Sequence, residues 1–261
     1  MISLEQVCLA NPITDRYLLK DISLEIHRGD RLAVIGSSGS GKTTLFRLLN
    51  GLASPTSGSL RFQGQNYLQI SPVALRRQIV LVTQEVRLLE MTVREALAYP
   101  LVLQKLPPAK IQATLGHWIE KFHIPQAWLG RTEQQLSLGQ RQWVGLCRAL
   151  ILQPPVLLLD EPTSALDRGR TEELLQILVE LNQQQQTTIL MVNHQLDVAQ
   201  QFATSLVYLQ QGELTPIEHF LETNSKTNSK TNSKINWDSI ANDLQIHQQQ
   251  LNSEWEVENS S

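Results

Sequence analysis

Gly36-Ser37-Ser38-Gly39-Ser40-Gly41-Lys42-Thr43 decides the fold of this 261-residue chain. The apolar run Arg31–Ile35 before it predicts a buried strand, and the leucine spacing from Thr43 to Gly51 after it predicts a helix. The glycines allow the backbone to curl, so that successive N–H groups point at one centre. A loop of this kind at the start of a helix binds phosphate. The stretch therefore predicts a nucleotide-binding α/β protein.

The side chains at the end of this loop have separate expected roles. Lys42 is expected to reach the β- and γ-phosphates, and the Thr43 hydroxyl is expected to bind Mg²⁺. Thr44 is expected to lie beside the α-phosphate. The alternative is a glycine-serine turn that arose by chance, which the Lys-Thr pair and the strand-loop-helix context argue against. The loop indicates a nucleotide but does not identify the reaction.

A second motif follows the apolar run Val156–Leu159, which predicts another buried strand. The strand ends in two carboxylates, Asp160 and Glu161. Asp160 is placed to hold Mg²⁺ through water, and Glu161 is placed to act as general base on an attacking water. Two solvated acids at a strand end are the alternative, which the phosphate-binding loop upstream disfavours.

The composition narrows the class of protein. Apolar residues make up 41% of the chain, the net charge is −3 and the pI is about 6.1. This charge balance does not favour a nucleic-acid-binding surface. Cys8 and Cys147 lie far apart and fit a reducing compartment. No signal peptide and no stretch of transmembrane length are visible, so we expect the chain to act at a membrane only by docking onto a partner.

The order of elements predicts a mixed α/β core with an insertion. Short alternating runs in residues 1–33 predict antiparallel strands, and residues 86–150 are expected to be mostly helical. Breaks in this helical part are expected at Pro100, at Pro107-Pro108 and at Pro125. The α/β alternation resumes afterwards, with a helix at Gly169–Gln183 and a strand at Thr188–Val192. A helical lobe inserted into an α/β domain is the expected result.

The end of the chain changes character. Thr223-Asn224-Ser225-Lys226 occurs three times in succession up to Lys234, without any apolar residue, which predicts a flexible linker over 221–236. Residues 237–261 form a tail that is expected to be mostly disordered or weakly helical. Its apolar residues are spaced near a helical period, so contact with a partner or with the protein's own core is the alternative. These residues are Trp237, Ile240, Leu244 and Leu251.

Further motifs make a family resemblance specific. Leu136-Ser137-Leu138-Gly139-Gln140 resembles the signature sequence of ABC-type ATPases, and Ser164–Asp167 resembles their D-loop. Gln84 and His194, each after a predicted strand, resemble the Q-loop glutamine and the switch histidine. Six elements stand in the family order between residues 36 and 194, and the resemblance covers roughly residues 1–216. It implies an ABC ATPase domain over 1–220 with a mixed sheet, an N-terminal antiparallel β subdomain and a helical lobe at about 86–150.

The resemblance also implies a site shared between two subunits. Two ATP molecules would lie between them, and Ser137, Gly139 and Gln140 of one subunit would close the site of the other. Gln84 would contact Mg²⁺ and water, His194 would contact the γ-phosphate, and Asp167 would contribute to the nucleotide site. Leu138 departs from the usual glycine of the signature, and this could slow turnover or alter dimer closure. Asn193 stands where threonine is commoner.

The residue that stacks on adenine is less defined. Tyr17 is the only aromatic residue before the phosphate-binding loop and is the natural candidate. In the family the aromatic residue often lies several positions earlier, and that register falls near Ile13. Either residue could contact the base.

The function implied by the resemblance is ATP hydrolysis that powers solute transport. The expected partners are an integral membrane permease and either a second copy or another ATPase subunit, at the cytoplasmic face of the membrane. Thr92–Glu95 and Tyr99-Pro100 look somewhat like ATPases of the iron-export type, but the sequence defines neither the solute nor the direction of transport. A soluble ABC ATPase acting in translation or DNA repair is the main alternative. A regulator without hydrolysis is disfavoured by Glu161 and His194.

Overall fold

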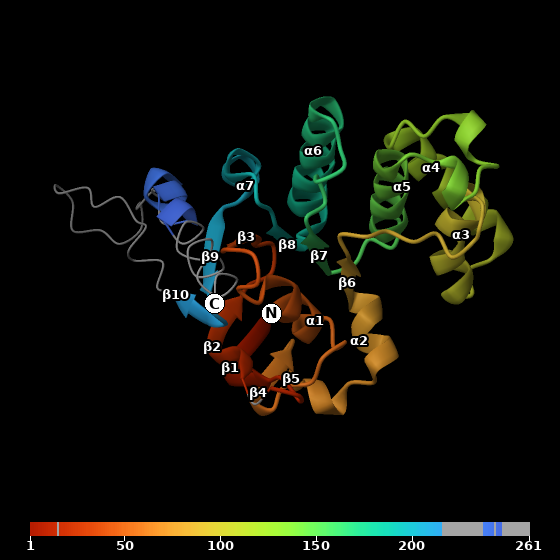
Figure 1. Cartoon of the computed structure of the whole chain (residues 1–261). Helices are drawn as coiled ribbons and strands as arrows, with labels where there is room; N and C mark the ends of the chain where they lie inside the picture. The colour runs from red at the N-terminus through yellow and green to blue at the C-terminus, as the bar shows by residue number, and fades with distance from the viewer. Residues whose placement is uncertain (15, 216–236, 243, 247–261) are drawn as a thin grey trace. The chain divides into compact units, whose positions relative to one another are not determined.

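The chain divides into two compact units in the computed structural model, which describes residues 1–14, 16–215, 237–242 and 244–246 (Figure 1). The first unit contains Met1–His27, Arg31–Gln69 and the chain from Val192 onward. The second unit contains Arg28–Asp30 and Ile70–Met191. The linker expected at 221–236 and the tail after residue 246 lie outside the described residues.

An antiparallel sheet forms one layer of the first unit. Its strands follow the order β2-β1-β4-β5, and Ile2 lies opposite Ile26 in the pairing of β1 with β2. Alternate apolar residues such as Leu4 and Ile22 are buried, because successive side chains of a strand point to opposite faces. The predicted antiparallel β subdomain is thus confirmed. It contains β1 (Ile2–Ala10), β2 (Tyr17–Ile26), β4 (Ser57–Phe62), β5 (Gln65–Asn66) and the following turn η1 (Tyr67–Gln69).

The other strands of the first unit carry the phosphate-binding loop. They follow the order β10-β9-β3, with β3 parallel to β9 and β10 antiparallel to it, so the sheet is mixed as predicted. Leu32 pairs with Ser205 and Ile35 with Tyr208, which places the end of β3 beside the middle of β9. The elements are β3 (Arg31–Ile35), α1 (Lys42–Leu49), α7 (Leu196–Phe202), β9 (Ser205–Gln210) and β10 (Glu213–Thr215).

Parallel strands also form the sheet of the second unit. They follow the order β8-β7-β6, and Ile79 to Val82 pair with Val156 to Leu159. Every residue of β7 and β8 is buried, as expected of strands in a parallel sheet covered on both faces. The elements are α2 (Pro72–Gln78), β6 (Ile79–Val82), α3 (Val93–Leu103), α4 (Pro108–Lys121), η2 (Gln126–Trp128), η3 (Glu133–Gln135), α5 (Leu138–Leu150), β7 (Val156–Asp160), α6 (Arg168–Gln185) and β8 (Thr188–Val192).

Helices α3, α4 and α5 form the inserted helical lobe, where α3 contacts both of the others (Figure 1). Aromatic side chains fill the space between them. Trp143 of α5 is fully buried, lies 4.9 Å from Phe122 between ring centroids and donates its indole N–H to the Phe122 carbonyl at 2.8 Å. A buried indole needs such a partner, so this bond fixes how α5 packs against the end of α4. No helix in the described part of the chain has the length and apolar character needed to cross a membrane.

The break predicted at Pro100 is wrong, because α3 continues through this residue to Leu103. A proline in a helix removes one backbone donor and crowds the preceding turn. Here Leu97 and Leu101 are both buried on either side of it, and their packing holds the helix together. The break predicted at Pro107-Pro108 is confirmed, since α4 begins at Pro108, where a missing N–H has no cost.

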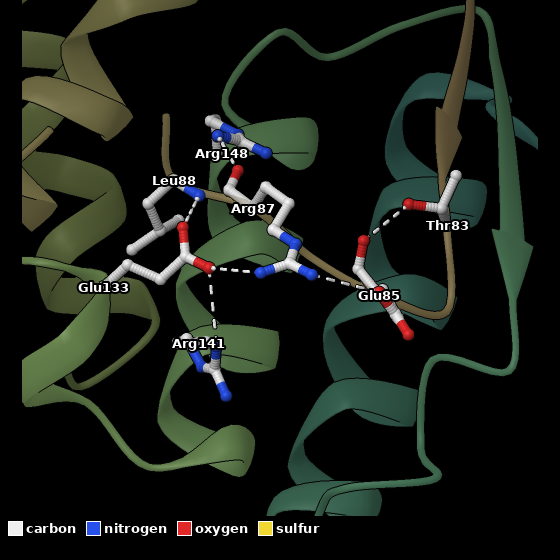
Figure 2. A network of polar contacts seen from close by, with 7 residues as sticks. All are labelled: Thr83, Glu85, Arg87, Leu88, Glu133, Arg141 and Arg148. Carbon is white, nitrogen blue, oxygen red and sulfur yellow. Dashed lines mark hydrogen bonds and ion pairs between the residues drawn. The ribbon is translucent and has the colours of Figure 1, made fainter. Parts of the chain in front are cut away.

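A polar network joins the loop after β6 to the helical lobe (Figure 2). The Glu133 carboxylate accepts the Leu88 backbone N–H at 2.7 Å, and it accepts side-chain N–H groups of Arg87 at 3.4 Å and Arg141 at 3.3 Å. Arg148 donates to the Arg87 carbonyl at 2.9 Å. One carboxylate thus connects three segments: the loop that begins with Thr83, the turn η3 and helix α5.

Replacement of Glu133 by glutamine tests this connection. The hydrogen bond from Leu88 N–H, with help from Arg87 and Arg141, lowers the pKa of Glu133 below its ordinary value. A lowered pKa contributes stability above the unfolded pKa, and that contribution is lost as the pH falls through the folded pKa. We expect E133Q to lower the free energy of unfolding by about 1–2 kcal/mol at pH 7, and the difference to shrink below about pH 4.

Urea unfolding at pH 7 and at pH 3.5, chosen to bracket the titration, measures both effects. Glu120→Gln on the exposed face of α4 is the matched control and should leave the midpoint unchanged. Equal midpoints for E133Q and the parent at pH 7, or a difference that grows in acid, would contradict the assignment.

Candidate nucleotide-binding site

The phosphate-binding loop begins where buried strand β3 ends. Gly36 has φ +152°, and a Cβ atom there would lie 2.1 Å from the Leu209 carbonyl oxygen, so only glycine fits against β9. The Gly212 N–H donates to the Ser40 carbonyl at 3.0 Å, which holds the far side of the loop. The β9–β10 turn therefore supports the loop from outside the motif, a contribution that the motif itself does not reveal.

Helix α1 begins with donors directed at the loop. Its N-cap residue is Gly41, at φ +105°, which has no side chain to accept the N–H groups of the first turn. The Lys42 ammonium is buried and donates to the carbonyls of Gly36 at 2.8 Å and Ser37 at 2.7 Å. Thr43 is exposed and Thr44 is half-buried, so the Thr43 hydroxyl is accessible to a metal ion.

The chemistry of this loop fits a nucleotide polyphosphate. Within the described residues, the Ser40 hydroxyl oxygen is buried without a hydrogen-bond partner. It lies in a loop that already offers helix N-terminal N–H groups and an ammonium, all of which favour an anion. A phosphate group would supply acceptors for the Ser40 hydroxyl and for the N–H groups at the start of α1. Ser38 and Gly39 are exposed at the tip of the loop.

Two other predicted site residues belong to the first unit. Tyr17 starts β2 with 55% of its surface exposed, and Ile13 is 89% exposed, so both are accessible to a base. His194 is exposed in the segment between β8 and α7. The Asn193 side chain accepts the Gln195 N–H at 2.9 Å, a local turn that fixes the backbone around His194. Asn193 therefore stabilises this turn, and a threonine hydroxyl would make the same kind of hydrogen bond more weakly.

The paired carboxylates lie in the second unit at the end of β7. Asp160 is buried, and Glu161 follows it with φ +52°, a backbone conformation that a glutamate adopts at a cost. Gln84 donates its side-chain N–H to the Glu161 carboxylate at 2.8 Å. Ser164 donates through its N–H at 3.3 Å and its hydroxyl at 3.0 Å to the Glu161 carbonyl. The predicted Q-loop glutamine and the predicted base are thus in direct contact.

The signature residues start helix α5 with a reciprocal cap. The Ser137 hydroxyl oxygen accepts the Gln140 N–H at 3.2 Å, and the Gln140 side-chain oxygen accepts the Ser137 N–H at 3.0 Å. In this arrangement both side chains act as acceptors. The serine O–H and the glutamine NH₂ are donors that the cap does not use. The capped helix start can therefore still donate to an anion.

Gly139 has a second role that the sequence did not reveal. A Cβ atom at this position would lie 2.5 Å from the Ala165 carbonyl oxygen, so the signature packs directly on the predicted D-loop. Gln142, buried in α5, donates to the Pro162 carbonyl at 3.3 Å. Both contacts join α5 to the turn after Glu161. In the sequence, the available signal for the second contact was a glutamine among the apolar residues of an amphipathic helix.

Two further predicted positions, Leu138 of the signature and Asp167 of the D-loop, are exposed. Leu138, the departure from the usual glycine, is 58% exposed, so it does not disturb the packing of its own unit. The Asp167 side chain accepts the Arg170 N–H at 2.9 Å and caps α6. This cap gives the Asp167 side chain a structural role, and its contact with a nucleotide stays a prediction.

The polar network around Glu133, four residues before Ser137, could not be predicted from the sequence pattern.

The sequence comparisons identify one family. The family model described as ABC transporter matches residues 19–164, more than half of the chain. The methionine import ATP-binding protein MetN of Caulobacter vibrioides is 37% identical over 200 residues, which cover 75% of this chain and 60% of that protein. MetN of Mannheimia succiniciproducens is 39% identical over 206 residues, covering 75% and 58%. The chain thus spans about 60% of the length of these relatives.

The expected likeness to iron-export ATPases is not supported, because these relatives are named for methionine import. Among solved structures, the ATP-binding cassette MJ0796, a dimer bound to ADP and Pi, has a TM-score of 0.76 at 28% identity and covers 83% of this chain and 97% of its own. CbiO1 from Clostridium perfringens has a TM-score of 0.74 at 25% identity and covers 96% and 94%. The family model matches more than half of the chain and the relatives are more than 30% identical over three quarters of it, so the chain belongs to the ABC transporter family.

Proposed function

We propose that this chain is the ATP-binding and ATP-hydrolysing subunit that powers solute transport by an ABC-type membrane transporter. One observation carries the proposal: Glu161 leaves buried strand β7 in a strained turn, with its carboxylate held at 2.8 Å by Gln84. A carboxylate fixed in this way is suited to accept a proton from water. The loop Gly36–Thr43 supplies the matching phosphate donors.

The proposed chemistry assigns a separate task to each of the predicted site residues. Lys42 and the N–H groups of the loop bind the β- and γ-phosphates, and Thr44 lies beside the α-phosphate. Thr43, Gln84 and Asp160 would hold Mg²⁺, which neutralises charge on the phosphates. Glu161 orients the attacking water and takes its proton. The His194 imidazole stabilises the charge that develops on the γ-phosphate. Tyr17 is the proposed contact for adenine.

We propose that the site is completed by a second ATPase subunit, either a copy of this chain or a related one. Ser137 and Gln140 have donors beyond those used in their mutual cap, and these would reach the γ-phosphate held by the other subunit. The backbone at Gly139 adds a further donor at the same helix start. The similar cassette MJ0796 is dimeric in its structure with ADP and Pi, which supports this arrangement.

The membrane partner is proposed to dock on the helical lobe of the second unit. A cavity there is lined by the end of β6, by α3 and by α5, and several apolar side chains at or near it are exposed. A permease would place a cytoplasmic segment in this cavity, with the ATPase held peripherally at that face of the membrane. Since the similar MetN proteins are named for methionine import, methionine uptake is the first transport activity to measure. The exposed apolar side chains are Leu89, Tyr99, Val102 and Leu103.

Replacement of Glu161 by glutamine tests the catalytic assignment. The amide keeps the shape of the carboxylate but cannot take a proton, so kcat should fall by about 10²- to 10³-fold. ATP affinity should stay within about threefold, because the phosphate donors are unchanged. Steady-state phosphate release and equilibrium ATP binding measure the two effects. Surface Glu172→Gln is the control, and normal hydrolysis by E161Q would exclude Glu161 as the base.

Complementation tests whether the site is shared. Chains with Lys42→Ala lack a phosphate ligand, and chains with Ser137→Arg have a blocked signature, so each variant alone should be inactive. Subunit mixing forms heterodimers that retain one intact composite site, and about a quarter of all sites should be intact. We expect ATPase activity well above that of either parent. Activity that remains at the level of the parents would contradict a site formed by two copies of this chain.

A charge placed in the proposed docking cavity tests the membrane partner. Leu103→Glu should reduce recovery of the chain with the membrane fraction by at least about tenfold, because a docked partner would bury the carboxylate without a counter-charge. ATP-dependent dimerisation should be unchanged. Val73→Glu, at an exposed apolar position on α2, is the matched control. Undiminished membrane recovery of Leu103→Glu would place the docking surface elsewhere.

A further inference from the structure

A segment that the ATPase motifs do not explain packs on the core of the first unit. Residues 237–242 and 244–246 are helical, and Ile240 is fully buried. Trp237 and Leu244 are partly buried against the same cluster, three positions before and four after Ile240. This spacing puts the three side chains on one helical face, whereas Ile246 is 52% exposed. The buried cluster around Ile240 contains Ala33, Ile35, Ala199, Leu206 and Tyr208.

The cluster includes the helix that follows the switch histidine. Ala199 belongs to α7, and Leu196 and Ala203 at the two ends of this helix pack against the cluster as well. Helix α7 starts two residues after His194 and has seven residues. A helix this short depends on tertiary packing, since its own hydrogen bonds cannot offset the cost of nucleation. In Figure 1 the C-terminal helix, in blue, accordingly lies near α7 and β9.

The same reasoning applies to the C-terminal helix. A segment of about ten residues does not hold a helix in water by itself, so it gains its structure by docking. Residues 216–236, which contain the Thr-Asn-Ser-Lys repeats, separate it from β10 in sequence. The segment is thus separated from β10 in sequence and contacts the core of the first unit through one apolar face.

We propose that residues 237–242 and 244–246 form an intramolecular docking segment that holds α7, and through it the His194 loop, in the position required for ATP hydrolysis. This inference rests on the proposed function of His194. Trp237, Ile240 and Leu244 are positioning residues in this scheme, because they act through α7 and do not touch the nucleotide. Occupancy of the docking surface would then control turnover, whereas the phosphate-binding loop would retain its affinity for ATP.

Replacement of Ile240 by aspartate in the full chain tests the inference. A buried charge should release the segment, and misplacement of the histidine should lower kcat about tenfold. KM for ATP should stay within about twofold, since the loop Gly36–Thr43 is unchanged. Hydrogen exchange should become faster in the amides of residues 196–203. Ile246→Asp, on the exposed side of the same helix, is the matched control and should change none of these quantities.

Two further variants separate positioning from loss of folding. Ile240→Ala and Ile240→Val are milder, and we expect a partial fall in kcat for alanine and near-parental kcat for valine. In a His194→Ala background, Ile240→Asp should lower kcat no further, although exchange in α7 should still increase. This double-mutant cycle links the effect to the histidine, which a general loss of stability would not do.

The outcomes distinguish this inference from the proposed function. Unchanged kcat in Ile240→Asp, together with faster exchange in α7, would overturn the positioning role. An equal fall in kcat in the parent and His194→Ala backgrounds would overturn it too. A parent chain without ATPase activity, alone and with its partner subunit, would instead overturn the proposed function. Exchange in α7 that is the same in Ile240→Asp and the parent would show that the segment does not dock.

Discussion

The N–H groups at the start of α1 require hydrogen-bond acceptors, and the loop and strands around them in the first unit are arranged about this helix start. Gly41 offers no side chain, so the helix start depends on a bound anion or on water. The surrounding structure holds these donors in place: β3 is buried beside β9, Gly36 lies against Leu209, and Gly212 fixes Ser40. The Lys42 ammonium adds the charge that the site needs. Contacts from β9 and from the β9–β10 turn thus determine the conformation of the loop.

The second unit is under a different constraint. The Glu161 carboxylate has to be held by a residue whose backbone has an unfavourable positive φ. A glutamate at φ +52° costs on the order of 1 kcal/mol, and the cost is met by contacts around the turn. Gln84 binds the Glu161 carboxylate and Ser164 binds its carbonyl, while Gln142 and Gly139 dock α5 onto the same turn. The proposed base and the signature helix therefore share one support.

The sequence allowed prediction of what is local along the chain. The strand before Gly36, the helix after the phosphate-binding loop and the strand before Asp160 each lie within a few residues of their motif, and their patterns were sufficient. Contacts between distant segments could not be predicted in this way. Glu133 reaches Leu88, and Gly139 reaches Ala165, only because α5 packs where it does. The helix end predicted at Pro100 is wrong for the same reason. The burial of Leu97 and Leu101 outweighs the unfavourable helix propensity of proline.

Helices α1 and α5 differ in how the N–H groups of their first turns are satisfied. Helix α1 begins at a glycine without a side-chain cap, so its first N–H groups are left for an anion or water. Helix α5 begins at Ser137 with a complete cap, so it is stable without any ligand. Its additional donors would then act only when a second subunit brings a phosphate to them. The two helix starts thus differ in what satisfies their N–H groups: an anion or water at α1, and the chain's own side chains at α5.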